Sequence, residues 1–81
     1  MQLAIITPTK KELFEITWIE FNTPNGNFVI QPGHAPTIFA LSEQKPFIYS
    51  LKNGKQEVVM VKRAVAEITR SNVTVLLSEV S

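Results

Sequence analysis

The sequence predicts an all-β domain, a sandwich or a barrel, and three observations carry this prediction. Turn signals such as TPNGN (23–27) and KNGK (52–55) recur at short intervals. Short stretches rich in Ile, Val, Phe, Thr and Leu lie between them. No segment long enough for a helix of several turns shows clean 3.6-residue periodicity. These features together are typical of short strands joined by tight turns.

Individual strands are indicated by period-two alternation, because successive side chains of a strand point to opposite faces. The predicted inward faces are Thr17, Ile19 and Phe21; Phe47, Tyr49 and Leu51; and Val73, Val75 and Leu77. The segment KKELFEIT (10–17) fits a strand or one helical turn, and the sequence leaves both open. Asn53-Gly54 predicts a type I′ hairpin, and Asn25-Gly26 repeats the signal more weakly because Pro24 precedes it.

The length and composition of the chain indicate one domain over residues 1–81. The net charge of +1 argues against nucleic-acid binding, which usually needs a basic face. The absence of cysteine excludes disulfides. No apolar run approaches the roughly 18 to 20 residues that span a membrane, and MQLAIITPTKK is too short and polar for a signal peptide. We therefore expect an intracellular protein without direct membrane insertion.

Catalytic chemistry is hard to build from these residues. A serine triad would need His34, the single histidine, as its base, and no serine lies in a nucleophile-elbow context. One histidine and scattered glutamates do not make a zinc site, and three glycines form no phosphate-binding loop. We predict no catalytic residues, no metal site and no cofactor. A hydrolase that uses His34 is a remote alternative.

The segment QPGHAP (31–36) is the stiffest part of the chain. Pro32 and Pro36 fix φ and restrict the residues before them, while Gly33 allows a backbone angle that other residues resist. Two interpretations stay open. The loop is a structural turn whose imidazole caps nearby backbone groups, or it is a preformed contact loop for another protein.

Two motifs in this order give the chain a resemblance to a known family. GNFVIQPGHAP (26–36), with AEITRSNVTVLLSE (66–79) downstream, resembles the epsilon subunit of F-type ATP synthases, which is called delta in mitochondria. The matching positions are Gly26, Ile30, Pro32, Gly33, His34, Ala35, Pro36, Glu67, Ile68 and Asn72 to Leu76. The opening LAIITPTKKELF also resembles the first strand and turn of that family, so the resemblance spans the chain.

The resemblance implies a β-sandwich of about ten strands and a non-catalytic place in the rotor. Family members bind the gamma subunit in the central stalk and rest on the polar loops of the membrane c-ring. They couple ion translocation to ATP synthesis without doing bond chemistry. It also implies a peripheral location on the cytoplasmic face of the bacterial plasma membrane. Many members carry a C-terminal helical hairpin, and from residues 1–81 we expect none, and hence no nucleotide binding.

Carried over by position, the resemblance assigns two contact regions. The gamma-contact residues are Pro8, His34, Ala35, Pro36 and Phe39. The c-ring contact residues are Asn25, Gly26 and Asn27, where family members often carry an acidic residue. For Phe39 a plain core position is an equally weighted alternative, and Glu67 is expected to make a local hydrogen bond within its strand.

Two further expectations follow. If the family assignment holds, apolar side chains should be exposed in a patch that awaits gamma. The alternative function is a small β-barrel module for single-stranded nucleic acid, with Phe47 and Tyr49 as surface stacking platforms.

Overall fold

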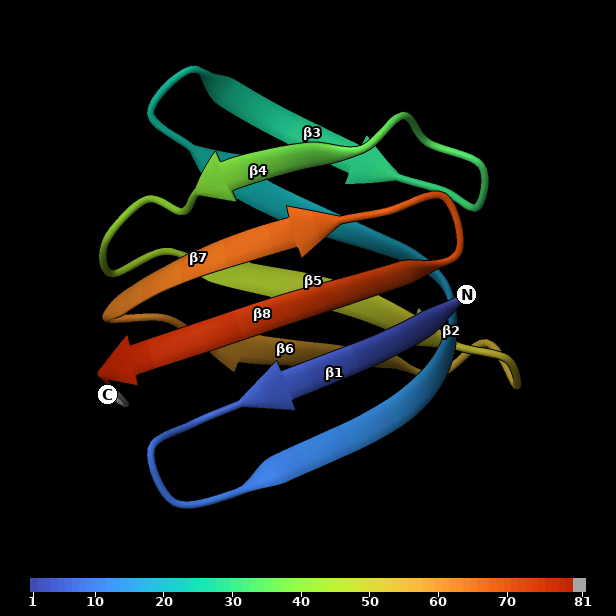
Figure 1. The fold of residues 1–81 in the computed structure, drawn as a ribbon, viewed down its shortest axis with the longest axis horizontal. Coiled ribbons are helices and arrows are strands. Elements are labelled where there is room, and N and C mark those ends of the chain that lie inside the picture. Colours follow the sequence, from blue (N-terminus) through green and yellow to red (C-terminus); the bar gives the residue numbers. More distant parts are fainter. Residues whose placement is uncertain (80–81) are drawn as a thin grey trace.

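The computed structural model describes residues 1–79, and every regular element in that range is a β-strand (Figure 1). The strands are β1 (Gln2–Ile6), β2 (Lys11–Thr23), β3 (Gly26–Ile30), β4 (Thr37–Ala40), β5 (Pro46–Leu51), β6 (Gln56–Met60), β7 (Arg63–Ile68) and β8 (Asn72–Glu79). The all-β prediction is confirmed. The described strands number eight rather than about ten.

The long strand β2 belongs to both layers of the sandwich. Its first part pairs antiparallel with β1, from Lys11 opposite Ile6 to Glu15 opposite Gln2. Its second part pairs with β3 and β5. Between the two parts the register shifts by a β-bulge at Ile16–Trp18. Bulges bend a strand and increase its twist, so one strand of 13 residues crosses from one sheet to the other.

The strands form two layers that face each other (Figure 1). Sheet A has the order β4-β7-β8-β1 and ends on the first part of β2. Sheet B has the order β3-β2-β5-β6. All neighbouring pairs are antiparallel except β1 and β8, which run parallel in the middle of sheet A. Of the segment 10–17, which the sequence left open, residues 11–17 therefore belong to strand β2.

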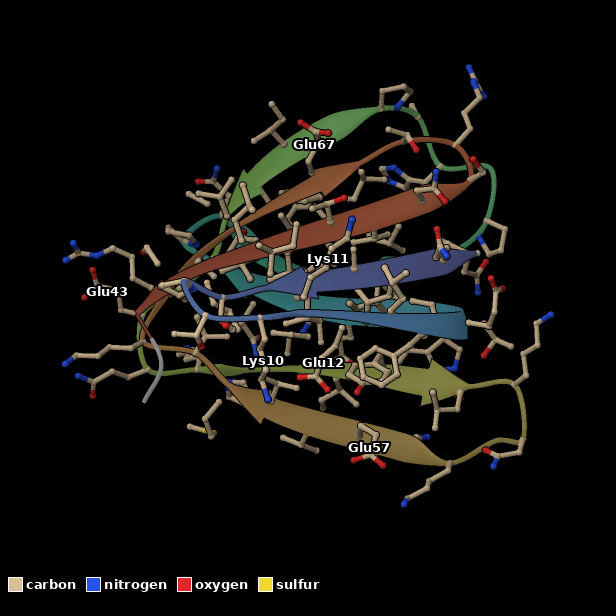
Figure 2. The ribbon with its side chains drawn as sticks, turned by 60° about the horizontal axis from the view of Figure 1, so that its bottom comes forward. Lys10, Lys11, Glu12, Glu43, Glu57 and Glu67 are labelled. Carbon is tan, nitrogen blue, oxygen red and sulfur yellow. The ribbon has the colours of Figure 1, made fainter. Side chains whose placement is uncertain are left out.

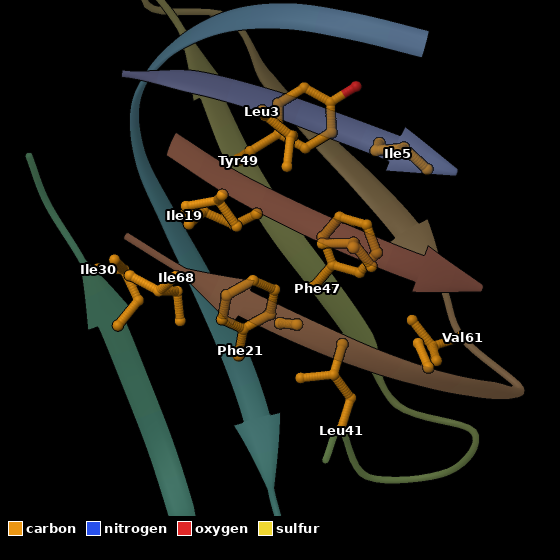
Figure 3. Packing of buried hydrophobic residues seen from close by; sticks show 14 of the residues in the cluster. Leu3, Ile5, Ile19, Phe21, Ile30, Leu41, Phe47, Tyr49, Val61 and Ile68 are labelled. Carbon is orange, nitrogen blue, oxygen red and sulfur yellow. The ribbon is translucent and has the colours of Figure 1, made fainter. Parts of the chain in front are cut away.

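Alternation places one face of each strand in a common core (Figure 3). The buried hydrophobic residues are Leu3, Ile5, Ile16, Ile19, Phe21, Ile30, Leu41, Phe47, Tyr49, Val61, Ala64, Ala66, Ile68, Val73, Val75 and Leu77. The predicted inward faces of β5 and β8 are confirmed. Thr17 is the exception, because the bulge turns Ile16 inward and leaves Thr17 exposed.

Aromatic rings run through the core as one continuous series. Neighbouring ring centroids lie 5.3 Å apart for Phe14 and Tyr49, 6.3 Å for Tyr49 and Phe47, and 5.8 Å for Phe47 and Phe21. The series ends in Phe39, 6.4 Å from Phe21, and in Phe28, 4.9 Å from Phe39. It contains all five phenylalanines and the tyrosine of the chain. Tilted and offset pairs at these distances are the favourable geometries for aromatic rings.

The hairpin at Asn53-Gly54 differs from the type I′ prediction. That turn needs positive φ at both central residues, and here Gly54 has a φ of 90° while Asn53 does not have a positive φ. The nitrogen of Gly54 donates to the carbonyl of Leu51, and the nitrogen of Leu51 donates to the carbonyl of Lys55. The loop therefore has three residues, with glycine in the left-handed position. The side chain of Asn53 instead accepts from the Lys55 nitrogen at 2.9 Å.

Phe21→Ala should remove the ring at the centre of the aromatic series. Phe21 is fully buried and its ring lies near both Phe39 and Phe47. We expect the free energy of unfolding to fall by about 3 to 5 kcal/mol, which a domain this small barely tolerates. Urea unfolding followed by circular dichroism measures the change. The control is Val58→Ala, at a side chain that is 60% exposed, and an equal loss there would contradict the central role of Phe21.

Stability should also fall at high pH because of Tyr49. Burial raises the pKa of the Tyr49 hydroxyl above its ordinary value of 10.0, and the charges of Glu57 and Glu12 raise it further. The folded state therefore holds this proton more tightly than the unfolded state, so the stabilisation is complete below pH 10 and is lost as the pH rises through the folded-state pKa. Unfolding measured between pH 8 and 11 (roughly the range that brackets this titration) should show a shallower decline for Tyr49→Phe. Identical slopes for both proteins would refute this.

Candidate functional site

The loop between β3 and β4 is fixed by backbone hydrogen bonds. The nitrogen of Gly33 donates to the carbonyl of Arg70 at 2.8 Å, which ties the loop to the turn between β7 and β8. The nitrogen of His34 donates to the carbonyl of Gln31 at 3.2 Å. Gly33 has a φ of 88°, a left-handed angle that favours glycine. The structure thus gives QPGHAP a defined shape in the free protein.

The imidazole of His34 is held within this loop. Its Nδ1 lies 2.7 Å from the carbonyl oxygen of Ala35, which also accepts from the Thr37 hydroxyl at 3.2 Å. Because a carbonyl oxygen only accepts, Nδ1 carries the proton in this contact, and Nε2 of the neutral ring is left as an acceptor. This contact agrees with the interpretation of the loop as a turn whose imidazole caps a backbone group, and its role as a contact loop stays a prediction. Ala35 and Pro36 themselves are exposed.

Pro8 does not lie with His34. It belongs to the turn between β1 and β2, where the nitrogen of Thr7 donates to the carbonyl of Lys10 at 2.9 Å and the Thr7 hydroxyl oxygen accepts from the Lys10 nitrogen at 3.1 Å. This turn and the loop between β3 and β4 lie at opposite ends of the strands (Figure 1). The residues assigned to gamma by resemblance therefore form two separate groups.

Phe39 points inward rather than to the surface. Its ring stacks on Phe28 at 4.9 Å and packs against the core cluster. The structure thus favours the core alternative for this residue. Its neighbour Ile38 faces outward with 68% of its surface exposed. Sequence reasoning missed Ile38, although alternation along β4 places the two residues on opposite faces.

The hairpin tip between β2 and β3 carries the residues assigned to the c-ring. The Thr23 hydroxyl donates to the carbonyl of Gly26 at 2.9 Å and accepts from the nitrogen of Asn25 at 3.2 Å. The Asn27 amide donates to Glu20 Oε2 at 2.8 Å. An acidic group that sequence reasoning missed is thus fixed beside the tip, because Asn27 lies opposite Asn22, two residues along β2 from Glu20.

Large apolar side chains are exposed on both outer faces, as the family assignment led us to expect, and Phe28 is exposed at the edge of the inner face, opposite Phe21. They are Leu13, Phe28, Val29, Ile38, Val58, Met60, Val65 and Leu76. Four of these, Leu13, Ile38, Val65 and Leu76, belong to strands of sheet A. Figure 2 shows this side of the molecule, with Glu67 and Lys11 on it.

An open hollow of about 490 Å³ lies between the loop and sheet A. Its lining residues are Pro36, Thr37, Ile38, Glu67, Ile68 and Thr69. The carboxylate of Glu67 makes no side-chain hydrogen bond or ion pair within residues 1–79, so the local hydrogen bond expected for it is wrong. Because Pro36 of the loop and residues of β4 and β7 line the same hollow, the exposed face of sheet A extends to the loop that carries His34.

The nucleic-acid alternative does not fit this structure. Phe47 and Tyr49 are 1% and 4% exposed, so neither ring is available for stacking on a base. Within the described part of the chain, no three His, Cys or acidic side chains lie close enough together to hold a metal ion. Residues 1–79 also contain no helix of the length and apolarity that a membrane crossing requires.

The family to which the chain belongs is decided by a match over its whole length. Residues 1–81 match the family described as ATP synthase, Delta/Epsilon chain, beta-sandwich domain. The chain belongs to this family. The resemblance drawn from QPGHAP and NVTVL is thereby confirmed, and so is the β-sandwich. No individual curated protein matches it in sequence.

Solved structures share the fold of this delta/epsilon-type domain. A chain of the Euglena gracilis mitochondrial ATP synthase (OSCP/F1/c-ring, rotational state 1) superposes with a TM-score of 0.83 at 17% identity. A chain of the Tetrahymena thermophila mitochondrial ATP synthase (central stalk/c-ring) gives 0.78 at 16% identity. They cover 95% and 98% of this chain, whereas this chain spans only 49% and 63% of theirs.

Gly33→Ala tests how far the shape of the loop depends on glycine. A Cβ at Gly33 would meet nothing within 4 Å, so the substitution costs backbone strain alone. We expect the free energy of unfolding to fall by about 1 to 2 kcal/mol. The control Gln31→Ala changes an exposed side chain in the same loop and should stay within about 0.5 kcal/mol. Thermal unfolding of both variants measures this, and an unchanged Gly33→Ala would mean that the loop relaxes to another shape.

Proposed function

We propose that this chain is a non-catalytic central-stalk subunit of an F-type ATP synthase, which binds the gamma subunit and the polar loops of the c-ring. In this role it couples ion translocation to ATP synthesis at the cytoplasmic face of a bacterial plasma membrane. The observation that carries the proposal is the exposed apolar face of sheet A on a domain of the delta/epsilon family. Exposed patches of this kind mark interaction sites in soluble proteins.

Gamma would bind along sheet A. The two groups assigned to it, Pro8 at one end and His34, Ala35 and Pro36 at the other, are too far apart for one small contact. A partner that covers the sheet between them would touch both. Phe39 would then act from inside, by holding β4 against the core through its ring contact with Phe28.

The c-ring would meet the tip of the hairpin between β2 and β3. Asn25, Gly26 and Asn27 are exposed there and their backbone is fixed by the Thr23 hydroxyl. The ring loops are polar, so neutral hydrogen bonds from Asn25 and Asn27 suit them. Glu20, held at 2.8 Å from the Asn27 amide, supplies a carboxylate for a charge-assisted contact.

The mechanical role would follow from the packing. A subunit that passes torque from the ring to gamma must not deform between its two contact regions. The aromatic series crosses the core between the two sheets, and protein interiors packed in this way have low compressibility. No bond chemistry is required of the subunit itself.

Co-expression with the gamma subunit of the same genome tests this function. We expect a one-to-one complex on a sizing column at micromolar concentration, and we expect it to weaken for His34→Ala combined with Pro36→Ala, since both change the loop without touching the core. The matched control is Lys52→Ala, at an exposed side chain in the hairpin between β5 and β6. Absence of any complex would overturn the proposed function, and equal weakening by Lys52→Ala would overturn the placement of the loop.

A further inference from the structure

The outer face of sheet A is organised as two rows of side chains that cross all five of its strands. The pairing registers give the rows directly, because residues opposite each other on adjacent strands point the same way. One row is Ala40, Val65, Leu76, Ile6 and Lys11. The other is Ile38, Glu67, Thr74, Ala4 and Leu13. Seven of these ten residues are apolar.

Alternation normally leaves the outward face of a sandwich polar. Here four large apolar side chains of the rows are exposed: Ile38 by 68%, Leu13 by 55%, Leu76 by 48% and Val65 by 41%. Every adjacent pair of strands in sheet A thus carries at least one of these side chains. The rows form a contiguous apolar surface rather than scattered single residues.

Two opposite charges lie within these rows, three strand spacings apart. Glu67 lies on β7 and Lys11 on the first part of β2, and Figure 2 shows both on this side of the sheet. Within residues 1–79, neither side chain makes an ion pair or a side-chain hydrogen bond. Lys10 and Glu12, in contrast, form an ion pair with each other at 3.3 Å. Glu67 and Lys11 are therefore available to a partner.

The surroundings of Glu67 favour a cation from outside. The hollow that it lines is bordered by Ile38, Ile68 and Pro36, and Glu67 itself is exposed in the free protein. A partner that covered this face would exclude water from around the carboxylate, and a basic side chain of that partner would then be attracted to it more strongly. The chain brings no lysine or arginine of its own to this carboxylate among the described residues.

The secondary structure of the partner follows from hydrogen bonding. On the face of a sheet the backbone groups are already paired between strands, so an extended segment lying flat on it would leave its own backbone unsatisfied. An α-helix satisfies its backbone internally and packs readily on a sheet face. Five strands span about 19 Å, which a helix of about 13 residues covers.

The spacing of the two charges fits such a helix. Glu67 and Lys11 are separated by three strand spacings and by one row, two residues along a strand, which gives about 16 Å on the diagonal. Three helical turns rise by the same distance, and residues three turns apart lie on one helix face.

We infer that the outer face of sheet A is a docking surface for an amphipathic helix of another chain. The helix would place a lysine or arginine over Glu67 and an aspartate or glutamate, three turns further on, over Lys11. Leucine-like side chains between these two charges would cover Val65 and Leu76. The inference rests on the proposed function, since it states the kind of segment that a partner subunit would lay on the exposed face.

A designed peptide tests this inference without gamma. The probe is an amidated helical peptide of about 15 residues with one lysine, a glutamate three turns later and leucines between them on the same face. A second peptide has the two charges exchanged. Titrated into the ¹⁵N-labelled protein, the first should shift the amide signals of Leu13, Val65 and Leu76 and leave Val58 unshifted. The exchanged peptide should bind roughly tenfold more weakly.

Variants of the protein separate the apolar and the charged contributions. Leu76→Ser should weaken binding, while Val58→Ser, at an exposed residue of sheet B, should not. The double variant Glu67→Lys with Lys11→Glu should prefer the exchanged peptide, a reversal that a loss of stability cannot produce. The inference would be overturned if the double variant still preferred the first peptide. It would also be overturned if the amide signals that shift belonged to sheet B.

The last arm of the test concerns a second copy of this chain. If the same signals of sheet A shift with protein concentration alone, a second copy covers the face and the inference is wrong. Failure of the proposed function would look different. The protein would then form no complex with gamma, while the first peptide would still bind to sheet A.

Discussion

The contact on which the rest of the structure depends is the one between Phe21 and Phe47, with centroids 5.8 Å apart. These two fully buried rings join the series that ends in Phe14 at one side and Phe28 at the other. The series draws rings from β2, β3, β4 and β5, so it fixes the loose edge of sheet A to sheet B. Without it, β4 would be held by β7 alone. The position of the His34 loop, which leads into β4, follows from this packing.

Much of the fold could be predicted because it depends on local rules. Alternation gave the inward faces of β5 and β8, where Phe47, Tyr49, Val73 and Val75 are buried. The type I′ turn was wrong because Asn53-Gly54 also suits a three-residue loop, and the choice depends on strand register. The bulge at Ile16–Trp18 gave no local signal, since it serves the crossing of β2 between sheets.

The candidate site was predicted less completely, for a physical reason. Motif positions identify residues but not distances, and the resemblance therefore grouped Pro8 with His34 although strands of sheet A separate them. Glu20 and Ile38 were missed because their roles depend on neighbours. Glu20 matters through the Asn27 amide at 2.8 Å, and Ile38 through its place opposite Glu67. The apolar rows on sheet A exist only once five strands are in register.

The parallel pairing of β1 with β8 has a consequence for how the protein is made. Of the described strands, β1 is synthesised first and β8 last, yet they are neighbours in the middle of sheet A. Until β8 arrives, β1 has one neighbouring strand instead of two, and β7 cannot be joined to it. Contacts so distant along the chain slow folding, because the intervening loop must be closed first. On the ribosome the two parts of sheet A, β4 with β7 and β1 with β2, therefore stay unjoined until β8 has been synthesised, and the face that crosses all five strands forms only then.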